Sequence, residues 1–220
     1  IDEIHRLSKS IEEVLYPAME SGVLDIIIGK GPSARTVQLE LPPFTLVAAT
    51  TRMSLLSSPL RSRFSGGTFR LEFYSDEEIA RILERSSQLL GMETSPDILS
   101  DIAKRSRATP RTANYLLKRC RDLAQLENGA ITGDTAKRTF ELLEIDALGL
   151  HAPDRAVLDA IINKFNGGPV GLNTIAAATG EEQATIEDVL EPYLIRQGLL
   201  ERTPRGRIAT SSAYAHIQHS

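Results

Sequence analysis

Several features that define other protein classes are scarce or missing in this 220-residue sequence. Its single cysteine, Cys120, excludes a disulfide framework and fits a reducing, cytoplasmic compartment. No apolar run approaches the ~20 residues that a membrane helix needs, so we expect no membrane segment. The formal net charge of -4 argues against attraction of the whole chain to nucleic acid. Any such binding must therefore come from local basic patches.

The sequence also lacks an initiator methionine and a phosphate-binding loop. It begins in mid-pattern with IDEIHRL, so we expect a fragment of a longer protein. No G-x-x-x-x-G-K-[ST] stretch occurs, and Gly29-Lys30, the only Gly-Lys pair, suits a hairpin turn. His216 and His219 stand near a polar C-terminus, where we expect neither carboxylate nor thiol companions, and therefore no metal site. Cys120 is interpreted as a small core residue.

What is present divides into three blocks, and the first, residues 1–72, has a mixed α/β pattern. Ser10-x-x-Glu13 has the spacing of a capping box, and Pro17 should bend or shorten the helix that follows. Residues 23–41 alternate in polarity around a Gly/Pro/Ser turn, which predicts a hairpin. The nearly uncharged run 44–50 predicts a strand buried on both faces of a parallel sheet.

The other two blocks are mostly helical. In residues 73–147, Ser75 and Glu78 form a capping box for a helix over 75–91, and Thr109-Pro110 begins a helix over 109–129. Shorter helices are predicted around 96–106 and 132–143. Residues 148–220 show three helices and then two short strands around Pro204-Arg205-Gly206, which is the winged-helix pattern.

Five side chains are candidates for chemistry, and four of them have an ordinary structural alternative. Asp2 and Glu3 could hold Mg²⁺ and polarise water, but an isolated Asp-Glu is more often a solvated helix start. Thr51 could face the ligand crevice at a strand end, or cap the strand. Arg63, beside the apolar Phe64, could stabilise phosphoryl charge or be a surface residue. Arg111, in the first turn of its helix, opposes the helix dipole, which hints at an anionic partner.

A second group of basic residues lies at the predicted wing. Arg202, Arg205 and Arg207 cluster around the hairpin tip, where they suit contacts to the DNA backbone. The helix before the wing is acidic, with Glu187 and Asp188 among its residues. Base-specific reading in the major groove is therefore not expected.

The order of these pieces, together with the runs IDEIHRLS, EEVLYPAME, SSPLRSRF, ATPRTAN, EPYLIRQG and RTPRGR, resembles the RuvB family. Members of that family are bacterial AAA+ motors that drive branch migration of Holliday junctions. The resemblance covers essentially the whole chain. It implies an α/β plus all-α architecture: the C-terminal part of an AAA+ P-loop ATPase domain (1–72), a small helical lid (73–147) and a winged-helix DNA-binding domain (148–220).

The resemblance also implies a role for each candidate residue. Asp2 and Glu3 match the Walker B pair, with Asp2 holding Mg²⁺, and Thr51 matches sensor 1. Arg63 matches the arginine finger, which acts on ATP bound by the adjacent subunit of a homo-hexamer, and Arg111 matches sensor 2. ATP and Mg²⁺ are therefore the implied substrate and cofactor.

The same resemblance implies partners. The hairpin 23–41 corresponds to the segment that docks on RuvA, through apolar residues such as Val37 and Leu39. The wing arginines Arg202, Arg205 and Arg207 correspond to the part that contacts double-stranded and Holliday-junction DNA. RuvC is implied in the resolving complex. The implied processes are DNA recombination, repair and the SOS response.

Two departures from the family and two alternatives stay open. RFSGGTFRLEF is one residue longer and richer in glycine than the family's usual sequence, which could disturb the finger or the hinge to the lid. Ala108 stands where the family usually has glycine, a change expected to be mild. The alternatives are another AAA+ protein, such as a clamp-loader-like subunit, and a non-catalytic DNA-binding adaptor. Because it contains no phosphate loop, the chain alone is expected not to hydrolyse ATP.

Overall fold

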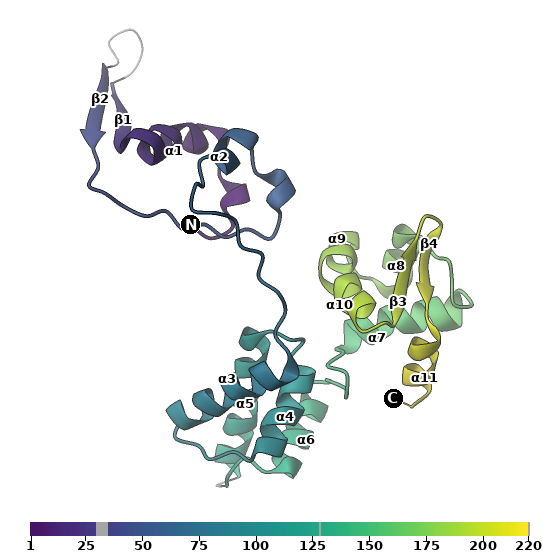
Figure 1. Ribbon diagram of the computed structural model, residues 1–220. Coiled ribbons are helices and arrows are strands. Elements are labelled where there is room, and N and C mark those ends of the chain that lie inside the picture. Colours follow the sequence, from purple (N-terminus) through teal and green to yellow (C-terminus); the bar gives the residue numbers. More distant parts are fainter. Residues whose placement is uncertain (30–34, 128, 220) are drawn as a thin grey trace. The chain divides into compact units, whose positions relative to one another are not determined.

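The computed structural model describes residues 1–29, 35–127 and 129–219 (Figure 1). The chain separates into two compact units, Ile1–Leu71 and a second unit that begins at Glu72. None of the helices formed by the described residues is both long and apolar enough to span a membrane.

The first unit combines a hairpin with short helices. A 3₁₀ turn (Ile4–Arg6) precedes α1 (Lys9–Ser21), and α2 (Ser58–Ser62) closes the unit after a second 3₁₀ turn (Met53–Leu55). Strands β1 (Val23–Ile28) and β2 (Arg35–Glu40) pair antiparallel, from Val23 opposite Glu40 to Ile28 opposite Arg35. The predicted hairpin is confirmed in its two arms, and the turn residues 30–34 lie outside the described residues.

The capping box predicted for this unit's first helix is wrong, and Pro17 does not shorten that helix. The residue at the N-cap of α1 is Ser8, not Ser10, and its side chain makes no capping hydrogen bond. Pro17 neither ends nor shortens the helix, which continues to Ser21. The residue after it, Ala18, is buried, so packing holds the last turn although proline removes one backbone donor.

The strand predicted over residues 44–50 is also absent from the described structure. The segment is largely exposed and carries no regular element. Within the described residues, its backbone bonds to the start of the chain: the Ile1 amino group donates to Val47 O at 2.7 Å, Ile4 N–H donates to Ala49 O at 3.0 Å, and Ala49 N–H donates to Ile1 O at 2.9 Å. A strand needs a partner along its whole length, and this short contact supplies one at a few residues only.

The described part of the predicted lid, residues 73–127 and 129–147, contains four helices, as the sequence predicts. These are α3 (Asp76–Leu89), α4 (Pro96–Arg105), α5 (Pro110–Leu126) and α6 (Gly133–Leu142). The capping box of α3 is confirmed: Ser75 Oγ accepts from Glu78 N–H at 3.2 Å, and Glu78 Oε2 accepts from Ser75 N–H at 2.9 Å. Apolar faces of all four helices meet in one core, which includes Cys120.

The winged-helix module follows the lid within the second unit. Its helices are α7 (Ala152–Asp159), α8 (Leu172–Thr179), α9 (Gln183–Thr185) and α10 (Glu191–Arg196), with π turns at Ala160–Lys164 and Ile186–Leu190. Strands β3 (Leu200–Thr203) and β4 (Gly206–Ala209) form the wing, and a further helix, α11 (Ser211–His219), was not predicted. Because α7 continues into the first π turn, and α9, the second π turn and α10 follow one another directly, these elements form three helical segments. The predicted three helices and hairpin are thus confirmed within the described residues.

One residue of α11 corrects an expectation. His216 has a carboxylate neighbour, because its Nε2 lies 2.8 Å from Asp146 Oδ2. The two residues are 70 positions apart in sequence, so no local pattern could reveal the contact.

The buried cysteine gives a direct test of the lid core. Burial raises the pKa of the Cys120 thiol, so both thiolate formation and access should be suppressed. We expect no reaction with an aromatic disulfide reagent in native buffer and complete reaction in denaturant, followed by absorbance. A Leu89→Cys variant, whose new thiol replaces an exposed side chain, should react at once. Rapid native labelling of Cys120 would contradict this packing.

Candidate functional site

The structure brings the acidic pair and the predicted threonine together. Thr51 Oγ1 donates to Glu3 Oε2 at 3.1 Å, although the two residues are 48 positions apart. His5 Nδ1 lies 3.1 Å from the same carboxylate oxygen and 2.8 Å from Thr50 Oγ1. His5 was overlooked in the sequence, although it lies in the same IDEIHRL run. A hydroxyl and an imidazole thus orient the Glu3 carboxylate.

The backbone at Glu3 supports a special role for this corner. Its φ of 47° lies in the left-handed region, which residues other than glycine seldom occupy. Such conformations persist where surrounding contacts hold them, and they cluster at functional sites. Here the carboxylate contacts to Thr51 and His5 supply that support.

The neighbouring carboxylate, Asp2, fits the coordination preference of Mg²⁺. Asp2 is exposed, and its Oδ1 accepts from the Glu3 N–H at 3.0 Å. Mg²⁺ is commonly held by one or two carboxylates together with substrate phosphates and water. No cluster of three or more metal-ligating side chains occurs among the described residues. The donor set at Asp2 and Glu3 thus suits Mg²⁺ that arrives with a phosphate ligand.

Arg63 is held within its own unit, apart from the acidic corner. It directly follows α2, and its Nη2 pairs with Glu20 Oε1 at 2.9 Å while Nη1 donates to Pro59 O at 2.7 Å. The guanidinium also stacks on the Tyr16 ring, 4.2 Å from its centroid. These contacts fix the side chain in one place, and none of them is with Asp2, Glu3 or Thr51.

A buried carboxylate that sequence reasoning missed supports the Arg63 segment. Glu12, only 7% exposed, accepts from Ser57 Oγ at 2.6 Å and from Tyr16 Oη at 3.1 Å. Ser57 is the N-cap of α2 and accepts from Leu60 N–H. Glu12 therefore holds both the helix before Arg63 and the ring beneath it. The spacing of Glu12 and Tyr16, one helical turn apart, was the only available signal.

Arg111 lies where the sequence predicts, in the first turn of α5. It is exposed, and within the described residues its guanidinium has no hydrogen-bond or ion-pair partner. A cation at a helix N-terminus is electrostatically unfavourable and gains from a nearby anion. The side chain is thus available to an anionic ligand.

The three wing arginines differ in their surroundings. Arg207 is 9% exposed, and its Nη2 lies 2.8 Å from Oε2 of the buried Glu191. Arg202 pairs with Glu187 at 2.9 Å. Arg205, at the turn between the strands, is exposed, and its guanidinium has no partner within the described residues.

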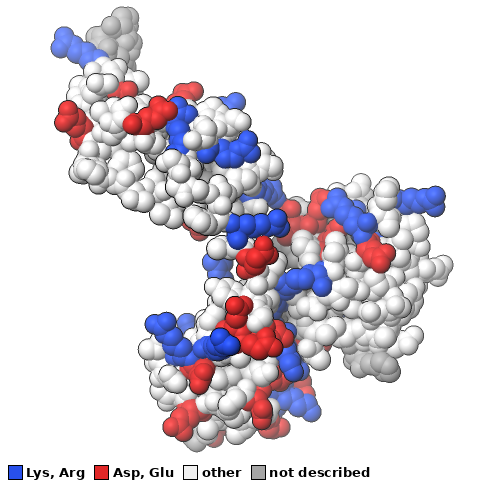
Figure 2. Space-filling model, viewed as in Figure 1, with Lys and Arg blue, Asp and Glu red and all other residues white. Residues whose placement is uncertain are grey.

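The acidic helix therefore has a structural task. Arg202 and Arg207 lie directly opposite each other in the wing, where like charges destabilise a strand pair. Glu187 and Glu191 offset that repulsion. On the face shown in Figure 2, acidic and basic side chains are interspersed over the described parts of the chain.

The hairpin carries an apolar strip. Val37 and Leu39 are 40% and 46% exposed, and they lie opposite Ile26 and Leu24 in the register of β1 and β2. Opposed residues share one face of an antiparallel pair. The two residues predicted to contact a partner are thus adjacent on one exposed face.

Profiles of the RuvB family match the chain from end to end. The Holliday junction DNA helicase RuvB P-loop domain matches residues 1–71, the RuvB AAA lid domain residues 74–146, and the RuvB C-terminal winged helix domain residues 147–218. Among solved structures, the Thermotoga maritima RuvB Holliday junction branch migration motor is 46% identical, with a TM-score of 0.80. The alignment covers 99% of this chain and 68% of that one. A Lys-to-Arg variant of the same protein is 47% identical over the same shares, with a TM-score of 0.80.

The contrast between the wing arginines predicts a difference in stability. Arg207→Ala would leave Glu191 buried without its partner, which should cost about 3–5 kcal/mol of unfolding free energy. Arg205→Ala, the matched control at the exposed turn, should change it by less than ~0.5 kcal/mol. Chemical denaturation followed by circular dichroism measures both. Equal losses would show that the Arg207–Glu191 pair does not hold the wing.

Proposed function

Because this chain belongs to the RuvB family, we propose that it is part of an ATP-driven motor that moves DNA through Holliday junctions. The supporting observation is the similarity along 99% of the chain to the Thermotoga maritima RuvB branch migration motor. The alternatives, a clamp-loader-like subunit or a DNA-binding adaptor, have no observation in their favour. We propose three domains: residues 1–72 belong to the ATPase domain, 73–147 form the lid and 148–220 the winged-helix domain.

In this proposal Glu3 polarises the water that attacks ATP. A carboxylate can accept a proton from water only if one of its oxygens is correctly aimed. Thr51 holds Glu3 by a hydrogen bond to Oε2, and His5 Nδ1 lies 3.1 Å from the same oxygen. Thr51 senses the γ-phosphate through the hydroxyl that contacts Glu3. When bound at Asp2, Mg²⁺ would neutralise charge on the phosphate oxygens.

Two arginines complete the proposed site from outside the acidic corner. Arg63 stabilises the transferring phosphoryl group of ATP on a neighbouring subunit, which agrees with its separation from Glu3 and Thr51 in contacts. Before assembly, Glu20 and Tyr16 keep its guanidinium in place. Arg111 contacts the γ-phosphate from the lid. Its guanidinium makes no hydrogen bond or ion pair with any described residue.

The remaining surfaces are assigned to partners. The apolar strip at Val37 and Leu39 docks on RuvA, and Arg205 contacts the phosphate backbone of double-stranded DNA, with Arg202 in support. Arg207 contributes by holding the wing. The need for a neighbouring arginine implies an oligomer. We propose that it is a homo-hexameric ring, which acts in the cytoplasm on recombining and damaged DNA, with RuvC in the resolving complex.

A site shared between two subunits predicts that rings mixed from two inactive variants regain activity. In a full-length RuvB that carries this sequence, Arg63→Ala should lower hydrolysis roughly 10³-fold or more while ATP binding persists. Glu3→Gln should do the same. Rings mixed from both variants should regain activity, because some sites then combine an intact Glu3 with an intact neighbouring Arg63. A phosphate-release assay measures this, with the 220-residue chain, which has no phosphate-loop motif, as the inactive control. Mixed rings that stay inactive would contradict the arrangement.

DNA binding is expected to follow the electrostatics of phosphate contacts. Arg205→Ala should weaken binding to all sequences alike and reduce the slope of log affinity against log salt by about 1. Fluorescence anisotropy over a salt series measures both. Arg138→Ala, which removes a lid arginine paired with Glu127, is the control. A sequence-dependent loss would indicate base readout instead.

A further inference from the structure

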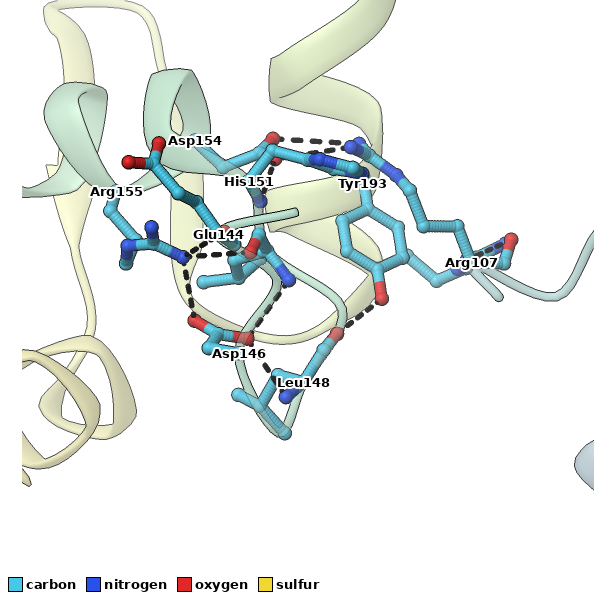
Figure 3. A network of polar contacts seen from close by, with 10 residues as sticks. Arg107, Glu144, Asp146, Leu148, His151, Asp154, Arg155 and Tyr193 are labelled. Carbon is cyan, nitrogen blue, oxygen red and sulfur yellow. Dashed lines mark hydrogen bonds and ion pairs between the residues drawn. The ribbon is translucent and has the colours of Figure 1, made fainter. Parts of the chain in front are cut away.

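The lid and the winged-helix module contact each other through several side chains. Arg107, in the connection between α4 and α5, makes two of these contacts, with Asp154 and with Tyr193. Its Nη1 lies 3.1 Å from Asp154 Oδ2, and its Nη2 donates to Asp154 Oδ1 at 3.4 Å. The flat face of the guanidinium stacks on the Tyr193 ring, 4.0 Å from the centroid. Figure 3 shows Arg107 reaching both residues, which belong to α7 and α10 of the winged-helix module.

The acidic partner of this contact is fully buried. Asp154 has 0% exposure, and it also accepts from the His151 N–H at 2.9 Å, which caps α7. A buried carboxylate is tolerated only when donors surround it. Since burial lowers the pKa of His151, its ring is neutral near pH 7 and supplies no competing cation. Arg107 is therefore the cation that compensates Asp154.

The backbone of Arg107 is held as well. Arg196, from α10, donates from Nη2 to Arg107 O at 2.8 Å. The Arg196 guanidinium also stacks on Phe73, 4.1 Å from its centroid, just before the lid's first helix. Both ends of Arg107 are thus fixed by the winged-helix module.

The covalent connection between the modules is bonded too. Asp146 Oδ1 accepts from the N–H groups of Leu148 and Leu150, each at 2.9 Å. Tyr193 Oη donates to Leu148 O at 2.5 Å, and burial raises the pKa of this phenol, which keeps the donor proton in place. A Cβ added at Gly149 would lie 2.8 Å from Arg105 O. This connector therefore lacks the freedom of a hinge.

The backbone conformation at Arg107 links this residue to Arg111, the candidate for contact with the nucleotide. Arg107 and Ala108 have φ values of 57° and 56°, two successive left-handed residues that are not glycine. Such a pair persists only when its surroundings impose it. The chain then enters α5 at Pro110, and Arg111 lies four residues beyond Arg107. The clamp on Arg107 thus sets the start of the helix that carries Arg111.

We propose that Arg107 is a positioning residue that joins the lid and the winged-helix module into one body. Movement of α5, when Arg111 gains or loses its anion, is then passed to the DNA-contacting wing instead of being absorbed between the modules. The first part of this proposal, that Arg107 joins the two modules, which we call the mechanical part, depends only on the contacts of Arg107. The second part, that a change at Arg111 reaches the wing, which we call the nucleotide part, rests on the proposed function of Arg111.

The mechanical part is tested on the 220-residue chain. Spin labels on Leu89→Cys, in the lid, and Val189→Cys, in the winged-helix module, replace exposed residues, while Cys120 stays buried and unlabelled. We expect one narrow distance distribution for the parent and a clearly broader one for Arg107→Gln. Arg119→Gln is the matched control, because that lid arginine pairs with Asp122 within its own helix.

A second variant keeps this test decisive if Arg107→Gln does not fold. Arg196 is exposed, and Arg196→Gln removes only the bond to Arg107 O and the stacking on aromatic rings. It should broaden the distribution to a smaller extent. If folded variants at both positions keep the parent's narrow distribution, the proposal is overturned.

The nucleotide part is tested in a full-length RuvB that carries this sequence. We expect a non-hydrolysable ATP analogue to change the DNA affinity of the parent. The ratio of DNA affinity with the analogue to DNA affinity without it should move toward 1 in Arg107→Gln, while hydrolysis without DNA is retained. An unchanged ratio would overturn the coupling. If Arg111→Ala leaves hydrolysis unaffected, the proposed role of Arg111 fails, and the label distances still decide whether Arg107 joins the two modules.

Discussion

A carboxylate that leaves water must find donors inside the protein, and three buried carboxylates set the geometry of this chain. Glu12 holds the N-cap of α2 and the ring beneath Arg63. Asp154 binds Arg107 where the lid meets the winged helix. Glu191 binds Arg207 in the wing. Each gains its stability from contacts that also fix a functional segment, because removing one partner leaves an uncompensated buried charge.

This constraint separates arginines that build the protein from those that remain available to ligands. Arg107 and Arg207 form ion pairs with buried carboxylates and are therefore not available to ligands. The guanidinium groups of Arg111 and Arg205 face solvent and have no partner among the described residues, and each lies at the end of an element that a buried pair supports. Arg63 is intermediate, since Glu20, which holds it, is itself exposed and could be exchanged for a phosphate at modest cost.

The same contacts decide where the chain can move. The division into compact units falls between Leu71 and Glu72, in a stretch without regular structure that follows the glycine-rich Ser65-Gly66-Gly67. Beyond it, the lid and the winged helix share the Arg107 clamp and a bonded connector. Motion is therefore expected at the first boundary and resisted at the second. A motor needs this contrast if movement at a nucleotide is to reach DNA.

The sequence by itself determined what depends on neighbouring residues. The capping box at Ser75, the hairpin arms and the order of helices and wing strands follow from spacings of a few residues, and the structure contains them. Its resemblance to the RuvB family rested on the same short runs. Only the tertiary structure decided which charged groups meet: Glu3 with Thr51, Arg107 with Asp154, and His216 with Asp146. It also showed that residues 44–50 form no strand, because strand formation depends on a partner elsewhere in the chain and not on the segment's own apolar pattern.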